Sequence, residues 1–327
     1  MEYRTLGQTG LQVSTICLGS VFFGSYVSAD QSVRIIHRAL DLGINFLDTA
    51  EIYQRPAYGI AEETVGAALQ GRRHEVVLAT KKRIDPIAYR TSGQTDRNLS
   101  RSHIVSGVEG SLRRLQTDHL DVYYAHHPDQ STPLEETLRA FDDLVRSGKV
   151  RYVGLSNYAA WQIVDALGLA DRYGFAPVAC LQNLYNLLDR SIEPELMPAC
   201  ERFGLGLVPY SPLAGGVLTG KYGQTDAVPA DSRAARFGQR EHGRPGHVPI
   251  LSARNLAIAR GLTALAEKRG ETTTRLALAW TLHQPAVTSI IMGASTPGQV
   301  EANVAATELA LAPEEIAQIS ALSDGRV

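Results

Sequence analysis

Residues 151–173 read RYVGLSNYAAWQIVDALGLADRY and contain the structural unit that decides the fold. Residues 152–155 form a short apolar run of strand length, and the polar pair Ser156–Asn157 follows it. The next segment, Ala159–Tyr173, places apolar residues at helical spacing. A strand, a polar turn and an amphipathic helix in this order are typical of parallel strands joined by helical crossovers.

The same unit recurs along most of the chain. The strand-like runs are Ser14–Leu18, Ile44–Leu47, Val76–Ala79, Leu120–Ala125, Tyr152–Leu155, Val178–Leu181, Leu205–Pro209 and Ser289–Met292. The helix-like segments are Asp30–Leu42, Ala61–Leu69, Ser100–Leu115, Pro133–Ser147, Ala159–Tyr173, Glu193–Phe203, Leu256–Arg269 and Thr273–His283. Strands buried on both faces fit an open doubly wound sheet or a closed barrel. Eight runs, and a length of 327 residues against roughly 250 for a typical (β/α)8 barrel, favour an α/β fold of the TIM-barrel type.

Three segments lie outside the eight units. We expect an N-terminal β-hairpin from Glu2–Leu6 and Leu11–Ser14 and a C-terminal helix over Pro313–Leu322. The Gly- and Arg-rich stretch Thr219–His247 is predicted to be a long cofactor-clamping loop, because loops of this length in compact folds are usually functional. No shift in composition marks a boundary, so the sequence predicts a single barrel domain over residues 1–327.

The composition excludes several classes of protein. Hydrophobic residues make up 44% of the chain and charged residues 20%, which is typical of a folded protein and not of a disordered one. A net charge of −2 with no basic block does not support nucleic-acid binding, and no apolar run reaches the length of a membrane span. Three widely spaced cysteines and a start without an apolar leader predict a cytoplasmic protein with a small-molecule partner. No sequence feature indicates an oligomeric state.

Polar residues follow the apolar runs at the ends where a barrel carries its active site. They are Asp48, Lys81, His126, Ser156 with Asn157, Gln182, Tyr210, and Gly293 with Ser295. Because the carboxyl ends of parallel strands form one ring, we expect these residues to converge there.

Four of the residue types fit one kind of chemistry. Asp48 and Lys81 can form an ion pair, and Tyr53 follows Asp48 by five positions. A tyrosine titrates near ~10 in water, and a neighbouring ammonium group favours its phenolate. His126 can add a hydrogen bond to a carbonyl oxygen. Together these groups are suited to giving a proton to a carbonyl that receives a hydride.

Other kinds of site are less well supported. The chain has no G-x-G-x-x-G fingerprint, and the P-loop-like run from Gly215 to Lys221 continues with Tyr222 where Ser or Thr would bind Mg²⁺. No spacing typical of zinc ligands occurs, so we expect no metal. A glycosidase needs two carboxylates at the strand ends, where only Asp48 stands out.

Seven motifs in order, with their spacing, resemble the aldo-keto reductase superfamily. They are NFLDTAEIY, VVLATK, SLRRLQTDHLDVYYAHHPD, RYVGLSNY, LQNLYNLL, VPYSPLAGGVLTGKY and IMGASTPGQVEAN. SPLAGGVLTGKY and the GAS segment are more similar to the bacterial and potassium-channel-β-like branch than to the aldose-reductase branch. The resemblance implies a (β/α)8 barrel that binds NAD(P)H across the strand ends, without metal or flavin.

The resemblance also implies roles for individual residues. Tyr53 is the expected general acid, with Asp48, Lys81 and His126 completing a catalytic tetrad, and the Thr-Lys motif selects Lys81 over Lys82. The expected cofactor contacts are Ser156, Asn157 and Gln182 at the nicotinamide carboxamide, Tyr210 on its ring, Ser211, Leu213, Gly215 and Lys221 along the pyrophosphate side, Lys221, Arg233 and Gln299 at the ribose 2′-phosphate, and Gly293, Ser295 and Asn303 towards the adenine. Basic residues at the ribose favour NADPH over NADH.

The sequence departs from the family pattern at three places that bear on substrate and cofactor. The segment Gln54–Gly59 replaces a common Gly-rich turn, Gln299 stands where many relatives have Arg, and Ala302 replaces an acidic residue common in one branch. We therefore predict an NADPH-dependent reductase of an aldehyde or ketone, sugars and keto-sugars included, with aromatic pocket residues. The pocket candidates are Phe22, Phe23, Tyr26, Tyr58, Tyr89 and Trp161. The alternative is an NADPH-binding regulatory subunit with little turnover, against which the complete tetrad argues.

Overall fold

The computed structural model describes residues 1–53, 58–82, 98–222, 232, 234–235 and 250–324. Its strands are β1 (Tyr3–Thr5), β2 (Gln12–Ser14), β3 (Ile16–Gly19), β4 (Phe46–Asp48), β5 (Val77–Lys82), β6 (Leu120–Ala125), β7 (Val150–Ser156), β8 (Val178–Gln182), β9 (Gly206–Leu207) and β10 (Ile290–Met292). Its α-helices are α1 (Ala29–Asp41), α2 (Ile60–Ala68), α4 (Arg101–Leu115), α5 (Leu134–Arg146), α6 (Ala160–Tyr173), α7 (Leu196–Phe203), α9 (Ala253–Arg269), α10 (Thr273–Leu282), α11 (Pro297–Val304) and α12 (Pro313–Ala321). Three short 3-10 helices are η1 (Arg73–Glu75), η2 (Ala214–Thr219) and η3 (Ala305–Glu308).

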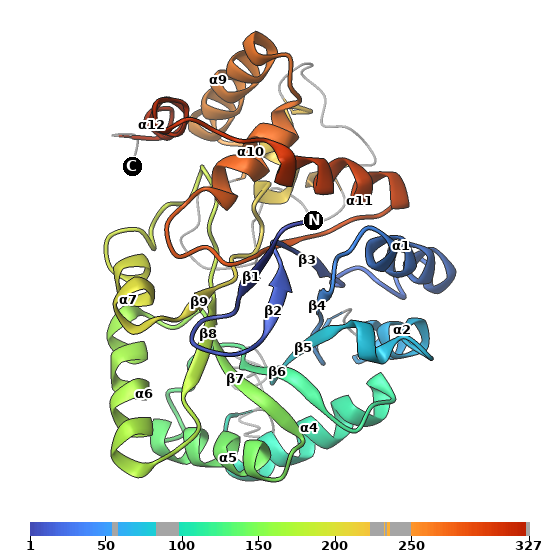
Figure 1. Ribbon diagram of the computed structural model, residues 1–327, viewed down its shortest axis with the longest axis vertical. Helices are drawn as coiled ribbons and strands as arrows, with labels where there is room; N and C mark the ends of the chain where they lie inside the picture. Colours follow the sequence, from blue (N-terminus) through green and yellow to red (C-terminus); the bar gives the residue numbers. More distant parts are fainter. Residues whose placement is uncertain (54–57, 83–97, 223–231, 233, 236–249, 325–327) are drawn as a thin grey trace.

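Eight parallel strands form one sheet in the order β10-β3-β4-β5-β6-β7-β8-β9. The two ends of this sheet meet, because the amide of Thr288 donates to Leu207 and that of Ile291 donates to the Pro209 carbonyl, both at 2.8 Å. Figure 1 shows the strands around a centre with the helices outside them. The predicted (β/α)8 barrel is thus confirmed.

The N-terminal hairpin of β1 and β2 is also confirmed. Its strands are antiparallel, with Tyr3 paired to Ser14 and Thr5 paired to Gln12. Leu6, at the turn, is fully buried and packs with the inward side chains of the barrel, such as Cys17 and Phe46. The hairpin therefore covers the amino end of the barrel and leaves the carboxyl end for function.

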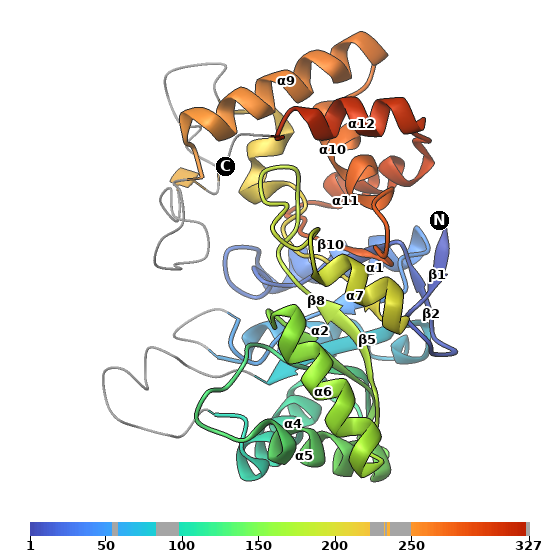
Figure 2. The same ribbon diagram turned by 90° about the vertical axis from the view of Figure 1, so that its left-hand side faces the viewer.

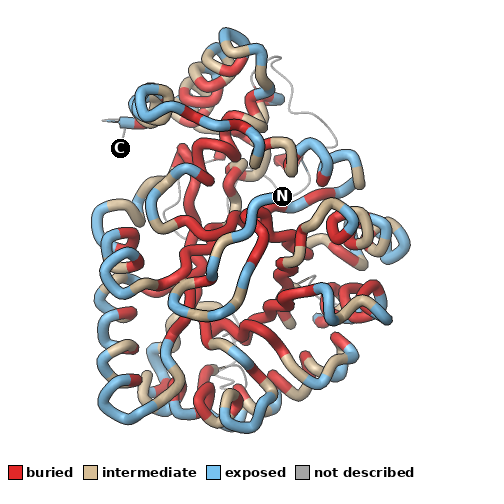
Figure 3. Tube along the Cα trace, viewed as in Figure 1, coloured by how far each residue is buried: buried red, intermediate tan, exposed pale blue. Residues whose placement is uncertain are grey.

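Side-chain alternation divides the core into two clusters. A smaller cluster fills the barrel interior and includes Phe46, Val77, Ala79 and Tyr124. A larger one lies between the strands and the surrounding helices. Figure 3 shows the result as buried strands inside a ring of helices whose outer faces are exposed. This alternation decides which strand-end side chains point into the carboxyl-end mouth.

Helix ends follow capping signals in the sequence. The side chains of Ser252 and Thr272 accept backbone hydrogen bonds at the starts of α9 and α10. Helix α9 is capped at its carboxyl end by Gly270, which has a left-handed φ of 73° that glycine adopts with little strain. Figure 2 shows α9, α10 and α12 together at one end of the molecule, beyond β10, where α12 confirms the expected C-terminal helix.

Two predicted elements are shorter by three residues in the structure. The helix expected over Glu193–Phe203 begins at Leu196, because Pro198 is tolerated only within the first turn of a helix. The run Leu205–Pro209 has strand geometry only at Gly206–Leu207, in keeping with the missing amide of Pro209. Helix α11 was not predicted, although Thr296 as its cap and Pro297 at its first position are a recognisable start signal.

Candidate active site

Three strand ends bring polar side chains into the barrel mouth. Asp48 is two residues after Phe46 on its strand, so both side chains point into the barrel. By the same alternation, Lys81 points inward with Val77 and Ala79, and Gln182 points inward with Cys180. Asp48, Lys81 and Gln182 are almost fully buried, with at most 3% of their surface exposed. The predicted convergence of these residues is therefore present at the carboxyl end.

Lys81 is the centre of the hydrogen-bond network. Its Nζ forms an ion pair with Asp48 Oδ1, donates to the carbonyl oxygen of Thr49 at 2.7 Å and donates to the Tyr53 hydroxyl at 3.0 Å. The second oxygen of Asp48 accepts a hydrogen bond from Gln182 Nε2 at 2.9 Å. The ammonium group is thus held in one place, at hydrogen-bond distance from the phenol.

The electrostatics of the network differ from the sequence-based expectation. Burial raises the pKa of Tyr53, and the opposing effect of the Lys81 charge does not cancel it. Burial by itself would lower the pKa of Lys81, but Asp48 and Tyr53 outweigh burial and raise it. At neutral pH the pair is therefore a protonated phenol beside a protonated lysine, which is the state of a proton donor.

His126 follows β6 and lies against Tyr53. The two rings are 6.2 Å apart between centroids and meet edge to face at 80°. Alternation along a strand would send the next side chain, His127, to the opposite face, but its ring stacks on that of His126 with the centroids 5.0 Å apart. Strand β6 ends at Ala125, so the alternation of the strand no longer fixes the direction of the next two side chains.

The residues expected at the nicotinamide form a second network beside the first. The Tyr210 hydroxyl donates to Asn157 Oδ1 at 2.8 Å. Asn157 Nδ2 donates to the His126 carbonyl at 3.0 Å and to Ser156 Oγ at 2.9 Å. Asn157 has a φ of 64°, a left-handed conformation that asparagine tolerates better than most residues.

The expected pyrophosphate segment continues from Tyr210. Ser211 has a φ of 58°, and its carbonyl accepts from Asn186 Nδ2 at 3.0 Å. Leu213 precedes η2, within which Gly215 is left-handed with a φ of 63°. Lys221 is exposed, with its Nζ 5.3 Å from the centroid of the Tyr222 ring. Closely spaced left-handed residues can turn successive backbone N–H groups towards one point, which makes the segment suited to binding an anion.

The residues expected at the adenine end, and Gln299 expected at the ribose 2′-phosphate, lie directly after β10 and on α11. Gln299 Oε1 accepts from the amide of Ser295 at 2.7 Å and from its hydroxyl at 3.0 Å. Asn303 is buried and donates to the sulfur of Met292. Gly293 directly follows β10. Arg233 and most of the loop Thr219–His247 lie outside the described residues.

The aromatic pocket candidates separate into two groups. Tyr26, Tyr58 and Trp161 are 53%, 39% and 68% exposed, and each follows the carboxyl end of a strand. Phe22 is partly buried, with its ring at 5.8 Å from that of Tyr26. Phe23 was predicted wrongly, since it is 1% exposed and packs in the larger core cluster between the strands and the helices. Tyr89 lies outside the described residues.

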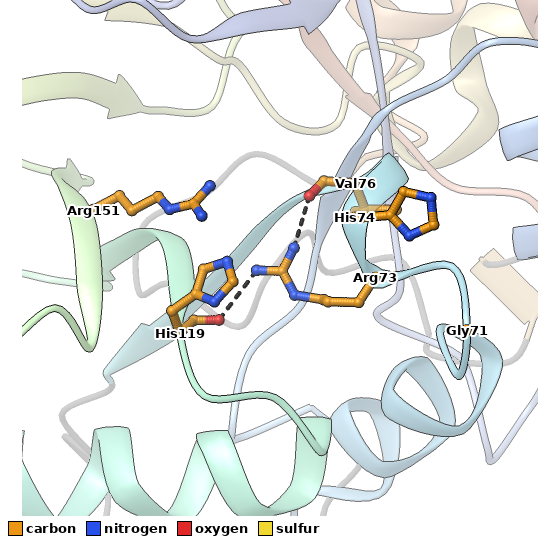
Figure 4. A pocket seen from close by; sticks show the side chains of 6 residues that line it. All are labelled: Gly71, Arg73, His74, Val76, His119 and Arg151. Atoms are coloured by element: carbon orange, nitrogen blue, oxygen red, sulfur yellow. Dashed lines mark hydrogen bonds between the residues drawn. The ribbon is translucent and has the colours of Figure 1, made fainter.

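A cavity of about 420 Å³ lies at the opposite end of the barrel (Figure 4). It is lined by Gly71, Arg73, His74, Val76, His119 and Arg151. Arg73 donates to the carbonyls of Val76 and His119, and both arginines form ion pairs with the buried Asp121. Because the lining residues stand at or near the amino ends of β5, β6 and β7, this cavity is separate from the barrel mouth at the carboxyl ends.

Two other features bear on the kind of site. Within the described residues, no group of three or more His, Cys, Asp and Glu side chains could hold a metal ion. None of the helices in those same ranges is long and apolar enough to cross a membrane.

Three contacts of the site were not predicted from the sequence. The Thr49 carbonyl has no side-chain signal, and the bond between Gln182 and Asp48 joins residues from distant strands. The third is an ion pair between Lys82 and Glu51 at 2.9 Å. Adjacent lysines at a strand end were a usable signal for it, because neighbouring side chains point to opposite faces and each needs its own partner.

Comparisons with known proteins identify the family of the chain. The model of the Aldo/keto reductase family matches residues 15–324. A probable voltage-gated potassium channel subunit beta of Arabidopsis thaliana is 39% identical over 94% of this chain and 92% of its own length. The uncharacterized oxidoreductase YrpG of Bacillus subtilis is 39% identical over 99% of this chain and 97% of its own. A probable potassium channel subunit beta of Oryza sativa subsp. japonica is 38% identical over 98% and 96%. The chain therefore belongs to the aldo/keto reductase family.

Proposed function

We propose that this protein is an NADPH-dependent reductase that converts an aldehyde or ketone into an alcohol. The observation that carries the proposal is the hydrogen bond from Lys81 Nζ to the Tyr53 hydroxyl, with Asp48 behind the lysine. Membership of the aldo/keto reductase family supports an oxidoreductase acting on carbonyl groups. We further propose that residues 1–327 act as one catalytic domain.

The residues at the strand ends fit a nicotinamide. Gln182 donates its amide N–H to Asp48, and its amide oxygen accepts no hydrogen bond within the described part of the chain. That oxygen is thus available to a carboxamide N–H. Ser156 and Asn157 offer further polar groups, and Tyr210 offers a ring held by Asn157. When bound, the reduced nicotinamide supplies the hydride.

The chain's own residues then complete the reaction. As the carbonyl carbon gains a hydride, the electron pair of the C=O bond moves to oxygen, and Tyr53 gives that oxygen its proton. The Lys81 ammonium stabilises the phenolate left behind, and Asp48 and the Thr49 carbonyl hold the ammonium in place. His126, against the Tyr53 ring, is positioned to hydrogen-bond the substrate oxygen. Solvent returns the proton to Tyr53.

The proposed cofactor is NADPH, and the proposed substrates include sugars and keto-sugars as well as aryl aldehydes. Lys221, exposed beside the left-handed Gly215 and Gly216, supports a phosphate site. Exposed Tyr26 and Trp161 support a substrate with an apolar face. All three cysteines are free and buried, which supports our inference of a reducing, cytoplasmic location and a small-molecule partner.

A regulatory subunit that binds NADPH with little turnover is the second candidate, because two relatives are named as probable potassium channel β subunits. The test is a titration with NADPH and NADH, followed by cofactor consumption with aryl aldehydes, diketones and keto-sugars. Tighter binding of NADPH with turnover is expected. Binding without turnover on any carbonyl would favour the regulatory subunit.

The pH dependence of the reaction tests the proton donor. Since burial raises the pKa of Tyr53 above its ordinary value of 10.0, the phenol keeps its proton through the neutral range. The turnover number for reduction should be level around neutrality and fall only as the pH passes above about 10. Alcohol oxidation, which needs the phenolate, should rise over the same interval. A reduction rate that falls between about pH 6 and 8 would assign the proton donor to a histidine instead.

A further inference from the structure

Two adjacent lysines at the end of β5 contact the segment that contains Tyr53, one from each side. Lys81 points into the barrel and contacts Asp48, Thr49 and Tyr53. Lys82 points outward, and its Nζ donates to Glu51 Oε1 at 2.9 Å. The Lys82 side chain is 7% exposed and that of Glu51 is 20% exposed, so this ion pair lies largely out of solvent.

Glu51 lies in the turn that leads directly into Tyr53. The amide of Tyr53 donates to the carbonyl of Ala50 at 3.2 Å, which closes a tight turn around Glu51 and Ile52. Ile52 is anchored in the interior with 6% of its surface exposed. Fixing the Glu51 carboxylate therefore fixes the turn from which the phenol projects towards Lys81.

Lys82 is itself held by the helices behind β5. Helix α4 approaches so closely that a Cβ on Gly107 would lie 2.6 Å from Lys82 Cδ and 3.1 Å from its Nζ. Thr80, on the same outward face, donates to Glu62 of α2 at 2.6 Å, and Arg114 of α4 donates to the same carboxylate at 2.7 Å. The outer face of this strand end is thus tied to α2 and α4.

Energetics favour a geometric role for the ion pair between Lys82 and Glu51. A buried ion pair adds little net stability, because desolvation offsets the attraction between the charges. A catalytic group misplaced by 1 Å, in contrast, can lower a rate by about 10²-fold. The pair lies at the rim of the site and joins the strand of Lys81 to the turn of Tyr53, where such a displacement matters most.

We propose that Glu51 and Lys82 are positioning residues that hold the Tyr53 hydroxyl at hydrogen-bond distance from Lys81 Nζ. This proposal rests on the proposed reductase function. The two residues act through the turn at Ala50–Tyr53 and through β5, and not by contact with the reacting atoms.

The experiment compares Lys82→Met, Glu51→Gln and the conservative Lys82→Arg with the wild-type full-length protein. For the first two, we expect the turnover number to fall by about 10- to 100-fold, with the NADPH dissociation constant within about two-fold of wild type. Lys82→Arg keeps the ion pair and should retain most of the turnover. A second readout is the high-pH limb, meaning the pH range above about 10 in which the turnover number falls. Because Lys81 lowers the pKa of Tyr53, a longer distance between Lys81 Nζ and the Tyr53 hydroxyl should move this limb to higher pH.

Two further variants separate positioning from general structural loss. Lys149→Met removes a 3.0 Å ion pair with Glu109 just before β7, at the other end of the barrel, and should leave turnover and the pH limb unchanged. Gly107→Ala pushes on the Lys82 side chain without removing a charge, and should move the pH limb in the same direction as Lys82→Met. If Lys82→Met does not fold, the turnover numbers and pH limbs of Glu51→Gln and Gly107→Ala test the positioning role in its place.

Failure of the positioning role and failure of the reductase function give different results. Unchanged turnover and an unmoved pH limb in Glu51→Gln and Lys82→Met would overturn the positioning role while leaving the reductase intact. A wild-type protein without turnover, or Tyr53→Phe with full turnover, would overturn the proposed function itself.

Discussion

Tyr53→Phe should bind NADPH as tightly as the wild type and lose carbonyl reduction by about 10²–10⁴-fold in turnover number, the range expected for a missing general acid. The substitution removes one hydroxyl, which accepts a hydrogen bond from Lys81 Nζ at 3.0 Å. The ring and its edge-to-face contact with His126 are kept. The measurement is cofactor binding by fluorescence together with steady-state reduction of the best carbonyl substrate.

The control for this variant is Tyr173→Phe, which removes the hydroxyl of a tyrosine that is 41% exposed at the end of α6. This variant should be as active as the wild type. Equal losses in both variants would mean that the effect of Tyr53→Phe is not specific to the site, and full turnover in Tyr53→Phe would assign the proton to another group.

Lys81→Met should lose a similar factor in turnover and should also be the least stable of these variants. Its ammonium group is fully buried and is the ion-pair partner of Asp48. Removing one member of a buried pair leaves an uncompensated charge, which typically costs about 3–5 kcal/mol of folding free energy. Chemical denaturation and steady-state kinetics measure the two losses separately.

The double variant Asp48→Asn/Lys81→Met separates stability from catalysis. It removes the buried charge that Lys81→Met leaves behind, so most of the lost unfolding free energy should return. Turnover should stay low, because the cation that stabilises the Tyr53 phenolate is still missing. Recovery of turnover together with stability would show that Lys81 only holds the fold.

The sequence predicted the barrel because its signal is repeated and local. Each strand must be apolar on both faces, and each crossover helix must be apolar on one, so the pattern of residues 151–173 recurs wherever the unit recurs. Elements whose ends depend on one residue were predicted less well. The start of α7 depends on Pro198, and the length of β9 depends on Pro209.

Side chains of the site were predicted where a strand fixes their direction. Asp48, Lys81 and Gln182 lie in strands, and alternation brings them to one mouth. Alternation does not give the direction of His127, because this residue lies beyond the end of β6. The balance of effects on the pKa of Tyr53 was missed for a different reason, since burial is a property of the whole fold and cannot be read from the charges of neighbours in sequence.

Transfer of deuterium from NADPH labelled at the transferring C4 position is the most direct test of the account. The wild-type protein would be incubated with this cofactor and the panel of aryl aldehydes, diketones and keto-sugars, and the products analysed by mass spectrometry. We predict an alcohol with one deuterium on its carbinol carbon, formed in proportion to the cofactor consumed. Tight binding of NADPH with no labelled alcohol from any carbonyl would contradict a reductase and leave a cofactor-binding subunit in its place.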